Sequence, residues 1–183
     1  MTATISDGVN TGSALSYTVT VTDATEIIIL DGQTGSVAED ASAGDAVMTV
    51  TITDSTPTAI LISAGNGDGI FAIATSGAVT IADATNLDYE TTSSYTLTIV
   101  AYDSSSSDVE DITITINNAN DAPTVATAIS DASTAEDSSY SLDISSNFDD
   151  EDTSDSLSYT ASGLPSSGNL AMSTAGVLSG TPT

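Results

Sequence analysis

The chain has 183 residues, of which 26 are acidic and none is Lys, Arg or His, so its formal net charge at neutral pH is −26. Without Lys or Arg the chain cannot neutralise phosphates, which excludes nucleic acid as a partner and disfavours an anionic membrane surface. Cys is also absent, so a Ser-His-Asp triad, a thiol nucleophile and a Schiff base are excluded as well.

Divalent cations are the natural counter-ions for this composition. Carboxylate and carbonyl oxygens are hard ligands that suit calcium better than zinc or copper. A solvated acidic surface of the halophilic kind fits the composition equally well. The positions of the acidic residues must therefore decide between this surface and a calcium site. No apolar run approaches the ~20 residues of a membrane span, and no signal peptide is visible.

Residues 1–26 are expected to be the C-terminal strands of a preceding repeat. Residues 16–22 alternate polar and apolar side chains with a period of two, which is typical of a half-buried strand. Residues 2–6 are a possible earlier strand before a glycine-rich turn, and residues 23–26 are a joint to the next domain.

Residues 27–121 are expected to form one complete domain. About seven short strands with turn signals every ~8–12 residues are the pattern of an antiparallel sandwich. Helical periodicity is absent over any useful length. The clearest strand candidates are residues 27–30, 46–53, 70–73, 78–81, 95–101 and 112–116.

Residues 122–183 are expected to be the N-terminal part of a second repeat. The predicted fold class is therefore all-β, with tandem Ig-like or cadherin-like antiparallel sandwiches of Greek-key topology. No counterpart of the last two strands of the first domain follows in this sequence. The strand candidates are residues 124–129, 139–144, 156–160, 169–172 and 176–178.

A series of motifs in the first domain occurs in the order in which cadherin repeats carry them. They are Val-Ala-Glu-Asp at residues 37–40, a hairpin at residues 69–73 and 77–81, Leu-Asp-Tyr-Glu at residues 87–90, a strand ending in Ala-Tyr-Asp at residues 95–103, and Asn-Ala-Asn-Asp-Ala-Pro at residues 118–123. One such match is weak, but an ordered set is specific. The domain therefore resembles a cadherin repeat in its bacterial form.

This resemblance implies a calcium site at the joint after residue 121. The implied ligands are Glu39, Asp88, Glu90, Asn118, Asn120 and Asp121. Calcium takes six to eight oxygen ligands, partly from bidentate carboxylates, at ~2.3–2.6 Å. The first Asp of the family's linker motif is Asn118 here, which removes one negative charge from the joint.

The second domain resembles a dystroglycan-type cadherin-like repeat, also described as a "putative Ig" repeat. The resemblance rests on Thr-Ala-Glu-Asp at residues 134–137, on residues 148–152 and on the ending at residues 176–183. It implies that Asp150 and Asp152 reach back to the central joint. An EF-hand loop starting at residue 149 is excluded, because the glycine at position six and the glutamate at position twelve are missing.

The resemblance also implies an upstream joint that contains Asp23, Glu26, Asp54 and Asp103. The family's Asp-x-Asp motif appears here as Asp54 followed by Ser and Thr, so a hydroxyl replaces one carboxylate. The upstream joint is therefore expected to bind calcium more weakly or to hold fewer ions.

These features predict a calcium-rigidified structural or extender module of an extracellular bacterial adhesin or surface filament. The expected partners are calcium and neighbouring repeats of the same or an identical chain. Residues 1–25 and 124–183 are complementary fragments of one domain type. They fit a tandem array, a fibre whose subunits complete each other head to tail by strand donation, or an arbitrary fragment.

Two other functional classes are less well supported. A carbohydrate- or partner-binding module usually exposes aromatic side chains, whereas this chain has no Trp, two Phe and six Tyr. An enzyme could use Asp88 and Glu90 as paired carboxylates for glycoside hydrolysis. Two positions so close on one segment suit a turn around an ion better, so we expect no enzymatic activity.

Overall fold

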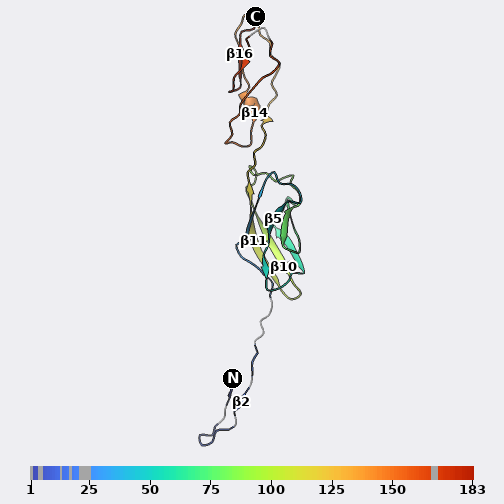
Figure 1. Ribbon diagram of the computed structural model, residues 1–183, viewed down its shortest axis with the longest axis vertical. Coiled ribbons are helices and arrows are strands. Elements are labelled where there is room, and N and C mark those ends of the chain that lie inside the picture. The colour runs from blue at the N-terminus through green and yellow to red at the C-terminus, as the bar shows by residue number, and fades with distance from the viewer. Residues whose placement is uncertain (1, 4–5, 13, 17, 21–25, 166–168) are drawn as a thin grey trace.

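The computed structural model describes residues 2–3, 6–12, 14–16, 18–20, 26–165 and 169–183. Figure 1 shows a chain drawn out along one axis, with a β-sandwich in its middle. The N-terminal hairpin lies beyond one end of this sandwich, and the C-terminal region lies beyond the other. No helix among the described residues is long and apolar enough to cross a membrane.

Two sheets form the central sandwich. Its strands are β3 (Ile28–Ile29), β4 (Thr34–Ala38), β5 (Ala46–Thr49), β6 (Ile52–Thr53), β7 (Ala59–Ala64), β8 (Phe71–Ile73), β9 (Ala78–Ile81), β10 (Ser94–Tyr102) and β11 (Ser107–Asn117). One sheet has the order β4-β11-β10-β7, the other has the order β5-β9-β8, and β3 pairs with β6. The pairs are antiparallel, except that β11 and β4 run parallel.

Alternating side chains of the two longest strands fill the core between the sheets. In β11, Ile112, Ile114 and Ile116 are at most 2% exposed, whereas the Thr residues between them face solvent. Leu97 and Ile99 of β10 are completely buried. The alternation predicted for residues 112–116 is confirmed, and so are the strand predicted at residues 95–101 and the all-β sandwich.

Truncating Leu97 to Ala is expected to lower the free energy of unfolding by about 3 kcal/mol, because the change leaves a cavity in the core. Leu61 on the neighbouring β7 is 54% exposed, so Leu61→Ala is a matched control that should cost less than about 1 kcal/mol. Urea unfolding followed by circular dichroism measures both variants. Equal losses of stability in the two variants would contradict the burial of Leu97 in the core.

The C-terminal region contains shorter strands and one helical turn. They are β12 (Thr124–Val125), β13 (Tyr140–Asp143), the 3₁₀ turn η1 (Ser145–Asn147), β14 (Phe148–Asp149), β15 (Ala171–Met172) and β16 (Val177–Gly180). β12 pairs with β14, and a three-stranded sheet has the order β13-β16-β15. Among the described residues of this region, Ile144 is the one buried hydrophobic side chain, at 8% exposure.

The N-terminal hairpin consists of β1 (Thr2–Ala3) and β2 (Leu15–Ser16), which pair antiparallel. An isolated bridge between Ser6 and Thr11 continues the pairing toward the turn. All residues of this hairpin whose exposure the structure describes face solvent. The hairpin is therefore held by backbone pairing, and none of its residues of described exposure is buried.

Four predicted strands are corrected by the structure. Of residues 16–22 only Ser16 lies in a strand, residues 18–20 lie in none, and residues 17, 21 and 22 lie outside the described residues. Residues 46–53 are divided into β5 and β6, because the Thr51 N–H donates to Gln33 Oε1 at 2.6 Å instead of to a strand. Of residues 124–129 only the first two pair, with β14. Residues 156–160 form no strand, because the bond from the Tyr159 N–H to Thr174 O at 3.3 Å is not continued into a ladder.

The strands β4 and β7 were not among the strand candidates of the sequence. In β4 the glycine Gly35 weakens the strand pattern. Its lack of a side chain has a packing reason, since a Cβ there would lie 3.0 Å from both Ile114 Cδ1 and Met48 Sδ. Sequence patterning alone does not reveal this close approach of β4 to the core.

Candidate metal centre

The parallel pairing of β4 with β11 places the first acidic residue at the end of the sandwich. Asn117 at the end of β11 lies opposite Ala38 at the end of β4, and the Glu39 N–H donates to Asn117 O at 3.1 Å. Glu39 therefore stands where the chain leaves the sandwich toward the C-terminal region. The loop between β9 and β10 brings Asp88 and Glu90 to the same place.

Three carboxylates gather at this end of the sandwich. Glu39, Asp88 and Glu90 each offer an oxygen, and these oxygens all lie within 4.8 Å of one another. Glu39 and Asp88 are half-buried, whereas Glu90 is exposed. No basic side chain exists in the sequence to neutralise them. This is the one group of this kind among the described residues.

Glu39 ties the linker to the loop that carries the other two acids. Its Oε1 accepts a hydrogen bond from the Ala119 N–H at 2.6 Å, and its Oε2 accepts one from the Tyr89 N–H. Both carboxylate oxygens are thus oriented by backbone donors. Sequence analysis did not identify these donors, since backbone N–H groups leave no signal in residue type.

Asn118 and Asp152 connect the linker with the C-terminal region. The Asn118 Nδ2 donates to Glu90 Oε1 at 2.7 Å and to Asp152 Oδ1 at 2.8 Å. The other oxygen of Asp152, Oδ2, accepts from the Asp121 N–H at 2.7 Å. Asp152 is only 7% exposed. A carboxylate from the C-terminal region is therefore buried against the linker and fully hydrogen-bonded there.

The remaining members predicted for the central joint also lie at the linker. The Asp152 N–H donates to Asp150 Oδ1 at 3.1 Å, so these two residues form one turn. The Asn120 Nδ2 donates to Asp121 O at 2.7 Å. Asp88 Oδ2 accepts from the Thr91 hydroxyl at 2.6 Å, a partner that the sequence analysis missed although Asp followed by Thr three residues later is a common local bond.

The carboxylates of the joint fall into two groups, those whose pKa is raised and those whose pKa is lowered. Partial desolvation by the surrounding chain raises the pKa of Glu90, although its side chain is exposed, and also raises that of Asp121; the neighbouring charges of Glu39 and Asp152 raise both further. The Asn118 amide, together with the Asp121 N–H, lowers the pKa of Asp152. Hydrogen bonds from the side chain and backbone of Thr91 lower the pKa of Asp88. Mutual repulsion is thus concentrated on Glu90 and Asp121.

The residues predicted for the upstream joint are not gathered in the same way. Asp23 lies outside the described residues. Glu26, Asp54 and Asp103 form no three-carboxylate group. The Asp103 Oδ1 accepts from the N–H groups of Ser105 and Ser106 at 2.7 and 2.6 Å, and such bonds hold the pKa of Asp103 well below its usual range. Asp103 therefore organises a turn in this structure.

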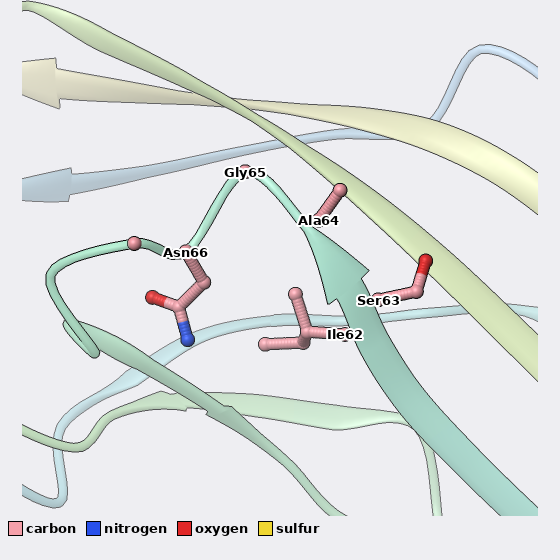
Figure 2. A pocket seen from close by; sticks show the side chains of 6 residues that line it. Ile62, Ser63, Ala64, Gly65 and Asn66 are labelled. Atoms are coloured by element: carbon pink, nitrogen blue, oxygen red, sulfur yellow. The ribbon is translucent and has the colours of Figure 1, made fainter.

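A second hollow of the sandwich lies at the end of β7. Figure 2 shows the side chains that line it, which include Ile62, Ser63 and Asn66. Asn66 bonds the backbone of Phe71 with both ends of its amide, at 2.7 and 3.0 Å. No titratable side chain lines the hollow, so it offers no chemistry comparable with the acidic joint.

Comparisons with known structures place the fold among cadherin repeats. Mouse Protocadherin-24 EC1-3 matches with a TM-score of 0.57 and 19% identity, covering 98% of this chain and 64% of that chain. Protocadherin Gamma B2 extracellular cadherin domains 3-6 match with a TM-score of 0.56 and 24% identity, covering 85% and 38%. Mouse Cadherin-23 EC22-24 matches with a TM-score of 0.52 and 19% identity, covering 84% and 53%.

This chain therefore spans between 38% and 64% of the length of these three structures. No curated protein matches the chain. Among family models, the one described as "Cadherin domain" matches residues 33–117, and the one described as "Putative Ig domain" matches residues 122–183. The chain thus contains a cadherin domain at residues 33–117, followed by a domain of the "Putative Ig" family at residues 122–183, and the resemblance of its motifs to these two families is confirmed.

Proposed function

We propose that this chain is a structural module of an extracellular adhesin or surface filament, of the bacterial type that its sequence resembles, and that calcium stiffens its central joint. The observation that carries the proposal is the group of Glu39, Asp88 and Glu90 in a chain without one basic side chain. The cadherin domain is an adhesion fold, and it supports no enzymatic role.

The residues present at the joint fit a calcium ion by their chemistry. The carboxylates are Glu39, Asp88, Glu90, Asp121, Asp150 and Asp152, and the side-chain amides are Asn118 and Asn120. This set offers only hard oxygen ligands, with several carboxylates, as calcium requires. No nitrogen or sulfur ligand that would favour zinc or copper is available.

The positive charge of calcium would act on the two groups where repulsion is concentrated. Glu90 and Asp121 have raised pKa values because partial desolvation, and then the neighbouring like charges, disfavour their ionised forms. A divalent cation close to these two carboxylates would stabilise their ionised forms and so lower both pKa values. Since Asp152 comes from the C-terminal region and Glu39 from the sandwich, a shared counter-ion would also favour one relative orientation of the two.

We further propose that residues 27–121 form the complete repeat, that residues 122–183 begin a second repeat and that residues 1–26 are the last strands of a preceding one. Asp23, Glu26, Asp54 and Asp103 would then serve the upstream joint, with fewer ions or weaker binding. The absence of Lys and Arg also removes trypsin-type cleavage sites, which suits an extracellular location.

Small-angle scattering during a calcium titration tests this function. We expect the chain to become longer and stiffer as calcium rises through the micromolar to millimolar range, and to relax when a chelator is added. Magnesium at the same concentration is the control, because it demands a smaller octahedral shell and should stiffen the joint less. Scattering curves that do not respond to calcium would contradict the proposal.

Replacing Asn118 by Asp should raise calcium affinity by about tenfold, because one more carboxylate joins the site. The same change removes the donor that bridges Glu90 and Asp152, so the joint should loosen in the presence of a chelator. Asn117→Asp adds the same charge at the neighbouring exposed position and is the matched control. Isothermal titration calorimetry measures both, and equal affinities for the two variants would argue against Asn118 as a ligand position.

A further inference from the structure

The sequence contains one Asn-Gly pair, at Asn66 and Gly67. Asn is among the thermolabile residue types, because its side-chain amide can be attacked by the backbone nitrogen of the next residue. Glycine has no Cβ, so the nitrogen that follows Asn66 is the least hindered of those that follow an Asn in this chain. Asn66 is therefore the side-chain amide with the highest intrinsic tendency to deamidate.

Deamidation at this pair needs water as its only co-reactant. The Gly67 nitrogen attacks Asn66 Cγ and forms a bond to it, the Cγ–Nδ2 bond breaks, and the proton of the Gly67 N–H leaves with Nδ2 as ammonia. A cyclic imide remains. Water then opens one of the two C–N bonds between the carbonyl carbons and the Gly67 nitrogen, which gives aspartate or isoaspartate in place of Asn66. The net reaction is the hydrolysis of one amide, without oxidation or reduction.

The fold holds the Asn66 amide in a clamp formed by the backbone of Phe71. Asn66 Nδ2 donates to Phe71 O at 2.7 Å, and the Phe71 N–H donates to Asn66 Oδ1 at 3.0 Å. Figure 2 shows the Asn66 amide turned toward the inside of the loop that follows β7. Imide formation turns Cγ toward Gly67 and releases Nδ2, so it breaks both bonds of the clamp.

The loop at residues 65–70 carries the clamp between two anchored ends. At its far end Ile70 is 1% exposed, and Ile70 O accepts from the Ala82 N–H at 2.7 Å. Within the loop, the Gly69 N–H donates to Asn66 O at 3.1 Å. Gly67 is exposed, and a Cβ built on it meets no atom within 4 Å. Water therefore reaches the pair, and the two bonds to Phe71 are what restrain the Asn66 side chain.

We propose that Asn66 is a latent deamidation site, which the Phe71 clamp closes in the folded chain and which opening of the loop at residues 65–70 exposes. The reaction then prevents the clamp from closing again. An aspartate carboxylate has acceptor oxygens and no donor, so Phe71 O loses its partner and faces a negative charge. Isoaspartate lengthens the backbone of the loop and displaces the clamp as well. Each opening that ends in hydrolysis is thus retained permanently in the chain.

The clamp connects the two sheets of the sandwich. Its loop leaves β7 of one sheet and enters β8 of the other at Phe71. Phe71 is 3% exposed and packs edge-on against Tyr95, with ring centroids 5.3 Å apart. Deamidation is therefore expected to destabilise the sandwich itself. Calcium takes no part in this argument, so the tests are made with a chelator, and their failure leaves the proposed calcium function untouched.

Peptide mass spectrometry of the full chain tests the site after incubation at mildly alkaline pH, in native buffer and in concentrated urea. The chain has no Lys or Arg, so a protease that cuts after Glu replaces trypsin, and fragmentation separates Asn66 from Asn86. Conversion of Asn66 should be at least about tenfold faster in urea, where the clamp is absent. Gly67→Ala should strongly slow the reaction in urea, because its methyl group hinders the nitrogen. Isomerisation at Asp68-Gly69 leaves the mass unchanged and does not interfere.

Two glycine variants test whether loop opening controls the reaction in the folded chain. Gly69→Ala strains the turn beside Asn66, where φ is 71°, and conversion in native buffer should accelerate by about fivefold. Gly44→Ala imposes the same kind of strain in another loop, where φ is 98°, and should react as the parent chain does. Equal rates in these two variants, equal rates of the parent chain in native buffer and urea, or an Asn66 that stays intact in urea would each overturn the proposal.

The consequence of the reaction is measured on its aspartate product, Asn66→Asp, by urea unfolding at neutral pH. The unfolding equilibrium constant should rise by about tenfold, because the acceptor Phe71 O is left without a donor. Ser76→Asp adds the same charge at an exposed turn between β8 and β9 and should unfold close to the parent chain. Equal stability of the two variants would contradict the role of the clamp. The parent chain and Gly67→Ala decide the chemistry even if Gly69→Ala fails to fold.

Discussion

Replacing Glu39 by Gln is expected to weaken calcium binding at the central joint by about 100-fold. The change removes one negative charge from the group of three carboxylates. It also replaces one oxygen by an amide nitrogen, which cannot accept a hydrogen bond. Either the Ala119 N–H or the Tyr89 N–H then loses the acceptor that orients the linker and the loop.

Isothermal titration calorimetry of the purified chain measures this loss. Glu110→Gln is the matched control, because Glu110 lies in the middle of β11, opposite Ile99 and away from the joint. The control should bind calcium as the parent chain does. If the two variants bind equally well, Glu39 is not a ligand, and the acids of the joint are only solvated.

Replacing Asp152 by Ala is expected to loosen the contact between linker and C-terminal region by about 2 kcal/mol, which is about 30-fold in the closed-to-open ratio. The buried carboxylate accepts from the Asn118 amide and from the Asp121 N–H at 2.8 and 2.7 Å. A hydrogen bond to a charged group is worth about 1.5–3 kcal/mol, and the total loss stays near this range because water replaces the acceptor at the exposed Asn118.

Amide hydrogen exchange at Asp121 reports this contact directly, because its N–H is bound by Asp152 itself. Exchange should accelerate by about 30-fold in the Asp152→Ala variant if local opening governs it. Glu151→Ala removes the same charge at the adjacent exposed position and should leave the exchange rate unchanged. An Asp121 amide that exchanges equally fast in the parent chain would show that the joint is open without calcium.

The sequence predicted strands correctly where the spacing of apolar residues follows a single pattern. The alternation in residues 112–116 predicted β11, because the side chains of this strand face the core and the solvent in turn. The run of β-forming residues at 95–101 predicted β10. Residues 46–53 show the limit of that signal. Their alternation continues through Thr51, but its N–H is taken by the side chain of Gln33, a partner that a local pattern does not reveal.

At the candidate site, too, the sequence predicted which residues come together but not the hydrogen bonds that each side chain makes. The ordered motifs placed Glu39, Asp88 and Glu90 at one joint, and the structure brings their oxygens together; calcium binding by them remains a prediction. For Asn118 the sequence showed only a lost charge. Its role as a donor to two carboxylates depends on where Glu90 and Asp152 lie, which only the folded chain determines.

The measurement that tests the central claim most directly is the distance distribution across the joint, with and without calcium. The chain has no Cys, so spin labels can be attached to Thr96→Cys and Ser141→Cys, two exposed positions on either side of the linker. Pulsed electron spin resonance should give a narrow distribution with calcium and a broad one with chelator. Identical distributions in the two conditions would contradict the account that calcium stiffens this joint.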